Sequence, residues 1–125
     1  MKRTLAVAVA AALAVPLVLA QDPAKPAAPV REFTTVNIET KGVKIWVNSD
    51  FVAKKGDKVK ITLINLAPSG VHAFAIKGYD VNVQVDNKEG DNKKTVEFVA
   101  DKAGFFPIYC SMHPAHVGGQ LTVLD

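Results

Sequence analysis

The chain has 125 residues, a length typical of one domain, and carries 15 basic against 12 acidic residues, a formal net charge of +3. Lys2 and Arg3 fall in an N-terminal segment that we expect to be removed, which leaves 13 basic against 12 acidic residues. No basic stripe with interleaved aromatic side chains is present, so the composition argues against a nucleic-acid-binding protein.

The first twenty residues have the pattern of a secretory signal peptide. A short basic start, Met1–Thr4, precedes sixteen apolar residues, Leu5–Ala20. That run is too short to span a membrane comfortably, and Val18-Leu19-Ala20 puts small residues where a signal peptidase reads. We therefore predict cleavage after Ala20 and a periplasmic or secreted protein with no membrane contact afterwards. An uncleaved membrane anchor is the alternative.

Residues 21–30, QDPAKPAAPV, are rich in proline and alanine and predict an extended tether. The folded domain is expected to cover residues 31–125. Period-two alternation and turn residues predict about eight short strands there and no helix, which is typical of an all-β sandwich or barrel. The expected strands are residues 33–38, 43–47, 59–65, 71–76, 81–85, 95–99, 105–110 and 120–124, with a turn at 54–57. The aromatic residues expected in the core are Trp46, Phe33, Phe74, Phe98, Phe105 and Phe106.

The single cysteine, Cys110, has no partner for an internal disulfide. A free thiol in an oxidising compartment is open to oxidation and to pairing with another chain, whereas a metal-bound thiolate is protected from both. Export therefore favours the interpretation of Cys110 as a metal ligand.

Two of the three histidines lie close to this cysteine. His113 follows it in a Cys-x-x-His spacing, and His116 comes three positions later. The third, His72, lies 38 residues upstream of Cys110, directly after a Pro-Ser-Gly turn. Thiolate and imidazole ligands select copper, zinc or iron over the hard cations. The working hypothesis is that all four side chains bind one copper ion.

Two of these histidines have plainer alternatives. His72 is expected at the start of a strand, and a histidine there is usually a hydrogen-bonded core residue and not a metal ligand. His116 could instead be a surface loop residue, although the Gly118-Gly119 pair after it would let the chain leave a tight loop around a metal.

A Cys-x-x-His on the loop before the last strand, with a histidine upstream, resembles the cupredoxins, the small blue-copper electron carriers. The resemblance implies a cupredoxin-like Greek-key β-sandwich, a copper cofactor and electron transfer rather than catalysis. The family's loop normally ends in a methionine that is a weak axial ligand, and the matching position here is His116. Some members use a glutamine, which makes Gln120 an alternative donor.

Within this family the chain is most similar to nitrosocyanin, a red copper protein, over residues 54–61, 100–114 and 116–124. That resemblance implies that Cys110, His113 and His116 bind copper. The sequence departs from it at His72, where nitrosocyanin has a glutamate, and in a shorter loop between His113 and His116. A more distant similarity is to the copper domain of cytochrome oxidase subunit II, whose binuclear centre needs two cysteines. One cysteine implies a single copper ion.

An axial imidazole should bind Cu(II) more strongly than a methionine and lower the reduction potential, so we expect a green or red site rather than an intensely blue one. A redox partner protein is expected to contact an apolar surface around the site, and transient redox contacts are small. The residues expected in this surface are Met112, Pro114, Ala115, Val117 and Pro68.

Three other functions stay open. A site with an open coordination position could react with a small molecule such as nitric oxide. A copper carrier is a second alternative, although such proteins usually have Met- or His-rich tracts and this chain has only Met1 and Met112. A structural zinc site is the third. The sequence does not identify the partner and leaves a homo-oligomer open.

Overall fold

The computed structural model describes residues 25–125, so the predicted signal peptide lies outside the described part of the chain. Residues 25–29 are exposed and have no regular secondary structure. Nine strands follow, and residues 25–125 contain no helix, hence none that could cross a membrane. The strands are β1 (Val30–Thr40), β2 (Val43–Val47), β3 (Asp50–Lys54), β4 (Lys58–Asn65), β5 (His72–Ile76), β6 (Val81–Val85), β7 (Lys93–Val99), β8 (Gly104–Tyr109) and β9 (Gln120–Leu124).

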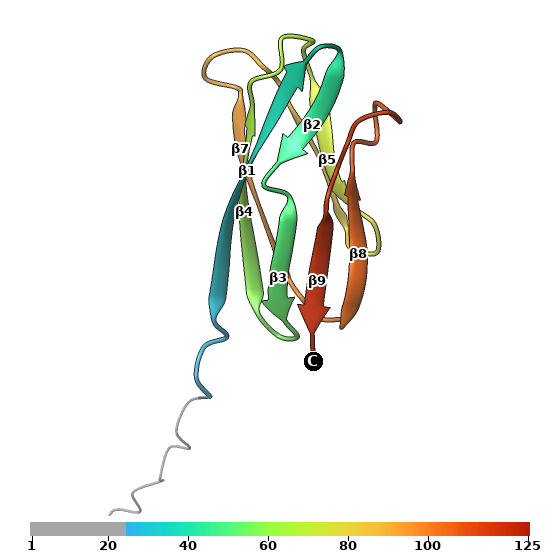
Figure 1. Cartoon of the computed structure of the whole chain (residues 1–125). Helices are drawn as coiled ribbons and strands as arrows, with labels where there is room; N and C mark the ends of the chain where they lie inside the picture. The colour runs from blue at the N-terminus through green and yellow to red at the C-terminus, as the bar shows by residue number, and fades with distance from the viewer. Residues whose placement is uncertain (1–24) are drawn as a thin grey trace, which may run out of the picture.

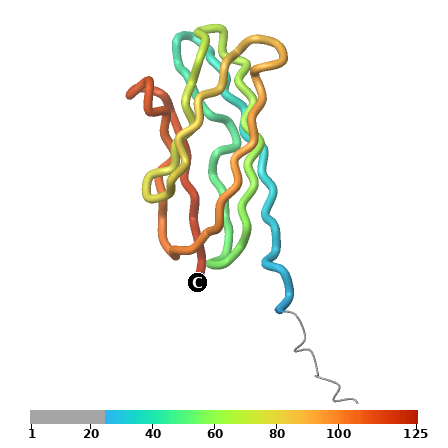
Figure 2. The backbone as a smooth tube through the Cα atoms, turned by 180° about the vertical axis from the view of Figure 1, so that it is seen from behind, coloured from blue at the N-terminus to red at the C-terminus, as the bar shows by residue number. Residues whose placement is uncertain are grey.

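The strands form two sheets that face each other, with the orders β2-β1-β4-β7 and β3-β9-β8-β5-β6 (Figure 1). This arrangement confirms the predicted all-β sandwich. Two pairings are parallel, β1 with β4 and β3 with β9, and the other pairings are antiparallel. From behind, the tube of β7 runs beside β4 at the edge of the first sheet (Figure 2).

The prediction of about eight strands misses β3. This strand has only five residues and alternates between exposed and buried side chains, and it precedes a charged turn that dominates the local pattern. Its backbone pairs with β9, so that Asp50 lies opposite Gln120. The strand therefore depends on a partner at the far end of the chain, which local propensity does not reveal.

The core fills the space between the sheets. Its largest fully buried side chains include Trp46, Phe51 and Phe74. Trp46 and Phe74 contact each other edge to face, with ring centroids 5.4 Å apart, and the indole N–H of Trp46 donates to the carbonyl oxygen of Ala73 at 3.1 Å. A buried indole thus keeps its hydrogen bond, as the low-dielectric interior requires.

The prediction that all six aromatic residues lie in the core is wrong for Phe105, which is 73% exposed. Strand β8 alternates, so Phe105 points outward while Phe106 packs against the core. Phe33 and Phe98 are partly buried against the same core. Side chains alternate along a strand, and two adjacent phenylalanines cannot both face the same layer.

The β8–β9 loop lies at the end of the sandwich opposite the C-terminus and is drawn in red (Figures 1 and 2). Its last part is fixed to the other sheet by Val117, whose N–H donates to the carbonyl of Lys44 and whose carbonyl accepts from the N–H of Trp46, at 2.9 and 3.1 Å. Both bonds go to β2. The loop is thus held between the two sheets.

Candidate metal centre

The four predicted ligands come from two segments at this end of the sandwich. His72 is the first residue of β5, as the Pro-Ser-Gly turn before it predicts. Cys110 directly follows β8, and the loop from β8 to β9 carries His113 and His116. Strands β5 and β8 are antiparallel neighbours, paired at Ala75 and Tyr109, which brings the start of one next to the end of the other.

Three of the four side chains form a compact cluster. The ligand atoms of His72, Cys110 and His113 all lie within 4.8 Å of one another. The sulfur of Cys110 is 3.5 Å from Nδ1 of His113, and the His72 and His113 ring centroids are 4.6 Å apart. His72 and Cys110 are buried, and His113 is partly exposed. Two imidazoles and a thiol therefore converge on one point beneath the surface.

His116 lies next to this cluster but outside it. Its ring centroid is 5.2 Å from that of His72, and its side chain is 7% exposed. Its Nε2 is 2.8 Å from Oδ1 of Asn37, a buried residue of β1. The interpretation of His116 as a surface loop residue is therefore wrong, because the ring points into the protein.

Two imidazole nitrogens in this region are buried without a hydrogen-bond partner. They are Nδ1 of His72 and Nδ1 of His116. A buried polar atom left unpaired costs roughly 1–3 kcal/mol, and such an atom is explained when an ion binds there. Imidazole nitrogens beside a thiol are the donors that copper accepts. The cluster of His72, Cys110 and His113 fits one copper ion.

The ring electrostatics suit metal binding. Burial, followed by the charge of His72, lowers the pKa of His116 to about 4. Burial, followed by the charge of His113, also lowers the pKa of His72. Both rings are therefore neutral at pH 7, the state in which an imidazole nitrogen can bind a metal. At His116 a proton does not compete with a metal until the pH approaches the pKa of about 4.

Hydrogen bonds from the surrounding protein hold two of the cluster side chains. The backbone N–H of Ala73 donates to the sulfur of Cys110 at 3.3 Å. The hydroxyl of Ser69 is 2.9 Å from Nε2 of His72. The same hydroxyl lowers the pKa of Glu39, whose carboxylate is 3.7 Å from Nζ of Lys44. Sequence patterns did not point to Ser69 or Glu39, because their contacts depend on how β1 and the turn before β5 come together.

The two glycines after His116 allow the chain to leave the loop. A Cβ atom on Gly118 would overlap the carbonyl oxygen of Ile108, and one on Gly119 would overlap Ser49. Neither glycine has a positive φ. These positions need glycine because of close backbone contact, and not because of a left-handed conformation.

The surface over the site is a shallow hollow of about 240 Å³. Its lining residues are Gly42, Lys44, Met112, His113, Pro114, Ala115 and His116. Met112 and the neighbouring Val117 are 43% and 45% exposed. The partly exposed His113 thus lies in a mostly apolar surface.

The alternative donor Gln120 turns away from the site. It is exposed at the start of β9, and its side-chain amide donates to Oγ1 of Thr122 at 3.2 Å.

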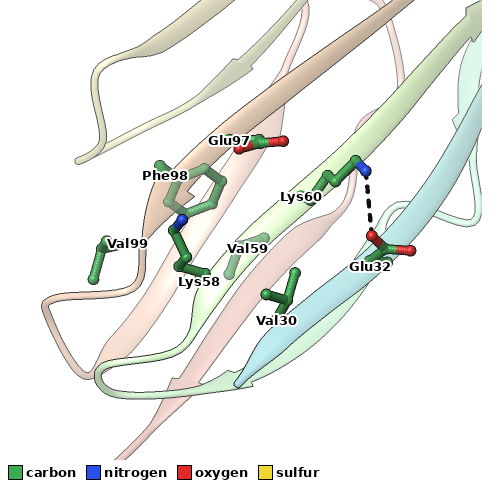
Figure 3. A pocket seen from close by; sticks show the side chains of 8 residues that line it. All are labelled: Val30, Glu32, Lys58, Val59, Lys60, Glu97, Phe98 and Val99. Atoms are coloured by element: carbon green, nitrogen blue, oxygen red, sulfur yellow. Dashed lines mark hydrogen bonds and ion pairs between the residues drawn. The ribbon is translucent and has the colours of Figure 1, made fainter. Parts of the chain in front are cut away.

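A larger pocket, of about 540 Å³, lies over β1, β4 and β7 at the opposite end of the sandwich (Figure 3). Among the described residues its lining contains no histidine and no cysteine. Its charged residues are Lys58, Glu97 and an exposed ion pair between Lys60 and Glu32 at 3.2 Å. The side chains that can bind a metal therefore lie at the smaller hollow and not at the larger pocket.

Comparison with known proteins agrees with this geometry. A family model described as a cupredoxin-like domain matches residues 9–123. Nitrous-oxide reductases from Ralstonia nicotianae and Cupriavidus necator are 40% and 42% identical to the chain over 72 residues, which is 54% of this chain and 11% of each relative. The chain therefore spans about a tenth of the length of these curated relatives.

Among solved structures, the fold is similar to that of a dithionite-reduced auracyanin from the photosynthetic bacterium Roseiflexus castenholzii. The TM-score is 0.58 at 16% sequence identity, over 75% of this chain and 97% of the other. At that identity the similarity concerns the fold, which is a cupredoxin-like β-sandwich of nine strands.

Proposed function

The chain belongs to the family of cupredoxin-like domains, and we propose that it is an exported mononuclear copper protein that transfers electrons. The proposed ligands are the thiolate of Cys110 and the imidazoles of His72, His113 and His116. Export rests on the signal-peptide pattern in residues 1–20. A redox partner protein is part of the proposal, and its identity and any self-association are left to experiment.

One observation carries the proposal of four ligands. Nδ1 of His72 and Nδ1 of His116 are both buried and both unpaired, and the centroids of the two rings are 5.2 Å apart. A single ion that binds both nitrogens removes two unfavourable groups at once. We therefore assign His116 to the axial position that methionine occupies in most relatives.

The residues also suit the electron-transfer role. Copper, when bound, cycles between Cu(I) and Cu(II) and so carries one electron. Burial of His72 and Cys110 keeps water away from the ion, and the fixed strands β5 and β8 keep the ligands in place in both states. His113 is partly exposed in the hollow, so its ring edge is the route by which an electron reaches the surface.

The experiment that tests the proposal is the visible and electron paramagnetic resonance spectrum of the Cu(II) protein, recorded with a His116→Ala variant. An axial imidazole predicts a green or red wild-type protein, and removal of that ligand should shift both spectra toward those of a blue site. An intensely blue wild type, or spectra that do not change on substitution, would contradict the assignment of His116.

A second candidate function keeps His116 off the metal. The ligand atom of His116 lies outside the three-residue cluster, and a hollow of about 240 Å³ lies over the site. In that case one coordination position would stay open for a small molecule such as nitric oxide. Binding of nitric oxide to the Cu(I) wild type would favour this candidate. Binding to the His116→Ala variant but not to the wild type would instead support four protein ligands.

The similarity to nitrosocyanin belongs to the same proposal. Nitrosocyanin has a glutamate where this chain has His72, so the ligand set here is more nitrogen-rich. A His72→Glu variant should therefore move the spectrum toward that of a red copper protein, because carboxylate adds charge and oxygen character. A variant that loses copper would show that this protein cannot accept the exchange.

The apolar surface around the hollow is proposed as the partner contact. The substitution Val117→Lys places a charge in it and should slow electron exchange with a redox partner at least several-fold while the copper spectrum stays unchanged, because the Val117 side chain is exposed. The matched control is Val99→Lys on β7, at the far end of the sandwich, where the valine is 49% exposed. Stopped-flow kinetics with a small c-type cytochrome measures both variants, and equal effects would argue against this surface.

A further inference from the structure

His116 is held by a chain of buried amide side chains. Asn37 in β1 and Asn65 at the end of β4 lie opposite each other in the parallel register of these strands, and both are fully buried. Asn37 Nδ2 is 2.9 Å from Asn65 Oδ1, and Asn37 Oδ1 is 2.8 Å from Nε2 of His116. These hydrogen bonds therefore connect the first sheet to the β8–β9 loop.

Backbone groups fix the direction of the Asn65 amide. Its oxygen lies 3.1 Å from the N–H of Ala67, which can only donate. Its nitrogen lies 2.7 Å from the carbonyl oxygen of Gly70 and 2.8 Å from that of Val85, which can only accept. Flipping the amide would oppose like groups at all three contacts, so the oxygen and nitrogen of Asn65 can be told apart.

The direction of Asn65 then determines that of Asn37 and of His116. Because the oxygen of Asn65 accepts, the group of Asn37 that faces it is the NH2 group. The oxygen of Asn37 is therefore left to face His116, and it can only accept. Nε2 of His116 must carry a proton to pair with it. In a neutral imidazole the other nitrogen, Nδ1, then has a free lone pair, and this is the buried atom that lacks a partner.

From this network we infer that Asn37 and Asn65 are positioning residues, which hold His116 in the Nε2–H tautomer and leave its Nδ1 lone pair free for the metal. The inference rests on the proposed function. Hydrogen bonds to the far nitrogen of a metal-binding histidine fix its tautomer and ring orientation, and losing one typically lowers metal affinity 10- to 100-fold. In this orientation the amide of Asn65 makes all the hydrogen bonds that it can, so any rotation of the amide would lose one of them.

The test uses metal-free protein first. Long-range proton–nitrogen NMR spectra of the histidine rings at pH 7 should show the Nε2–H tautomer alone for His116 in the wild type. Asn37→Ala should give a mixture of tautomers. Asn37→Asp keeps an oxygen facing the ring and should retain the Nε2–H tautomer, although its second oxygen loses the bond to Oδ1 of Asn65. The control is Thr35→Val in the same strand. It removes a different, partly buried hydrogen bond, which Oγ1 of Thr35 donates to the carbonyl oxygen of Val47 at 2.8 Å.

The second measurement is the affinity for Cu(II) by competition with a chelator. Asn37→Ala should lower it about 10-fold or more, and Thr35→Val should leave it close to that of the wild type. A wild-type His116 protonated at Nδ1, or equal effects of Asn37→Ala and Thr35→Val on tautomer and affinity, would overturn the inference. The NMR result does not depend on copper. A wild type that fails to bind copper would therefore overturn the proposed function, and the tautomer of His116 would still show whether Asn37 and Asn65 position its ring.

Discussion

Ser69 connects the buried ring of His72 to charged residues at the surface. Its hydroxyl is 2.9 Å from Nε2 of His72 and lies beside the carboxylate of Glu39. The hydroxyl faces Nε2, and the other ring nitrogen of His72, Nδ1, is the buried atom that lacks a partner.

Removing this hydroxyl is expected to weaken copper binding. Ser69→Ala should lower the affinity for Cu(II) about 10-fold or more, because the ring of His72 loses the bond that orients it. Competition with a chelator measures the change. Ser111→Ala is the control, since that exposed hydroxyl of the β8–β9 loop donates to Oδ1 of Asn82 at 2.9 Å and not to a ligand nitrogen. Equal losses in both variants would contradict an orienting role for Ser69.

At this scale the sequence predicts which side chains meet but not what surrounds them. Cysteine and histidine in a short spacing, with a histidine after a turn, have few uses other than metal binding in a β-protein whose sequence predicts export. Asn37 and Ser69, in contrast, are common residues in a strand and a turn. The role of Asn37 appears only when β1 pairs with β4 and the β8–β9 loop brings His116 to it. That of Ser69 appears only when the turn before β5 places its hydroxyl against the ring of His72.

The turn between β3 and β4 is held by one carboxylate. Asp57 accepts from the backbone N–H of Lys54 and from Nε of Arg31, both at 2.9 Å. The Arg31 bond, followed by the backbone bond, lowers the pKa of Asp57 below its usual 3.8. A carboxyl with a lowered pKa stabilises the fold above the pKa of the unfolded chain, and loses that effect as the pH falls through the folded value.

Asp57→Asn should therefore lower the free energy of unfolding at pH 7. The difference from the wild type should shrink as the pH falls below about 4, because the wild-type carboxyl takes up a proton there. Urea denaturation across that range checks both statements. Asp91→Asn, in an exposed turn, is the control for loss of a surface charge. A difference that stays constant with pH would show that Asp57 acts through shape alone.

The end of the ligand loop depends on a glycine. Gly118→Ala should destabilise the fold by more than about 2 kcal/mol, because a Cβ there overlaps the carbonyl oxygen of Ile108 and something must move. Gly90→Ala is the comparison: its Cβ would meet nothing within 4 Å, and the cost is limited to a positive φ of 90°. Thermal unfolding of the two metal-free variants measures the difference, and equal costs would contradict the close contact.

The elements themselves were mostly predictable, with errors that have a common cause. Alternating residues predict eight of the nine strands and the turns between them. Strand β3 is missed, and β1 is expected at residues 33–38 although it covers Val30–Thr40. The extra length of β1 follows from its pairing with β4 from Val30 to Asn37. Strand β3 forms because its backbone pairs with that of β9. Both depend on a neighbour and not on local preference.

Across the whole molecule, copper should act as a link between distant segments. The proposed ligands come from the start of β5 and from the loop after β8, so an ion binds the folded chain far better than the unfolded one. At free copper 1,000-fold above the dissociation constant, the gain is about 4 kcal/mol. The melting temperature of the wild type should rise by more than about 10 °C and return on addition of a chelator.

Cys110→Ala serves as the control for this stabilisation. The thiolate is the ligand that no other residue of the chain can replace, since the sequence has one cysteine. The variant should fold, because alanine is small and apolar, and its melting temperature should change little with copper. A copper-induced rise of the same size in the variant would place the metal elsewhere.

The parallel pair of β3 and β9 has a consequence for the order of events during biogenesis. A backbone N–H of β9, that of Gln120, bonds to the side chain of Asp50, 70 positions earlier in the chain. Contacts between such distant positions form slowly, after the local hairpins. The loop that carries three of the proposed ligands is bounded by β9, so it takes its final shape only when the C-terminal strand has docked. The proposed metal site would therefore be incomplete until β9 has docked, and we expect metal loading to follow folding.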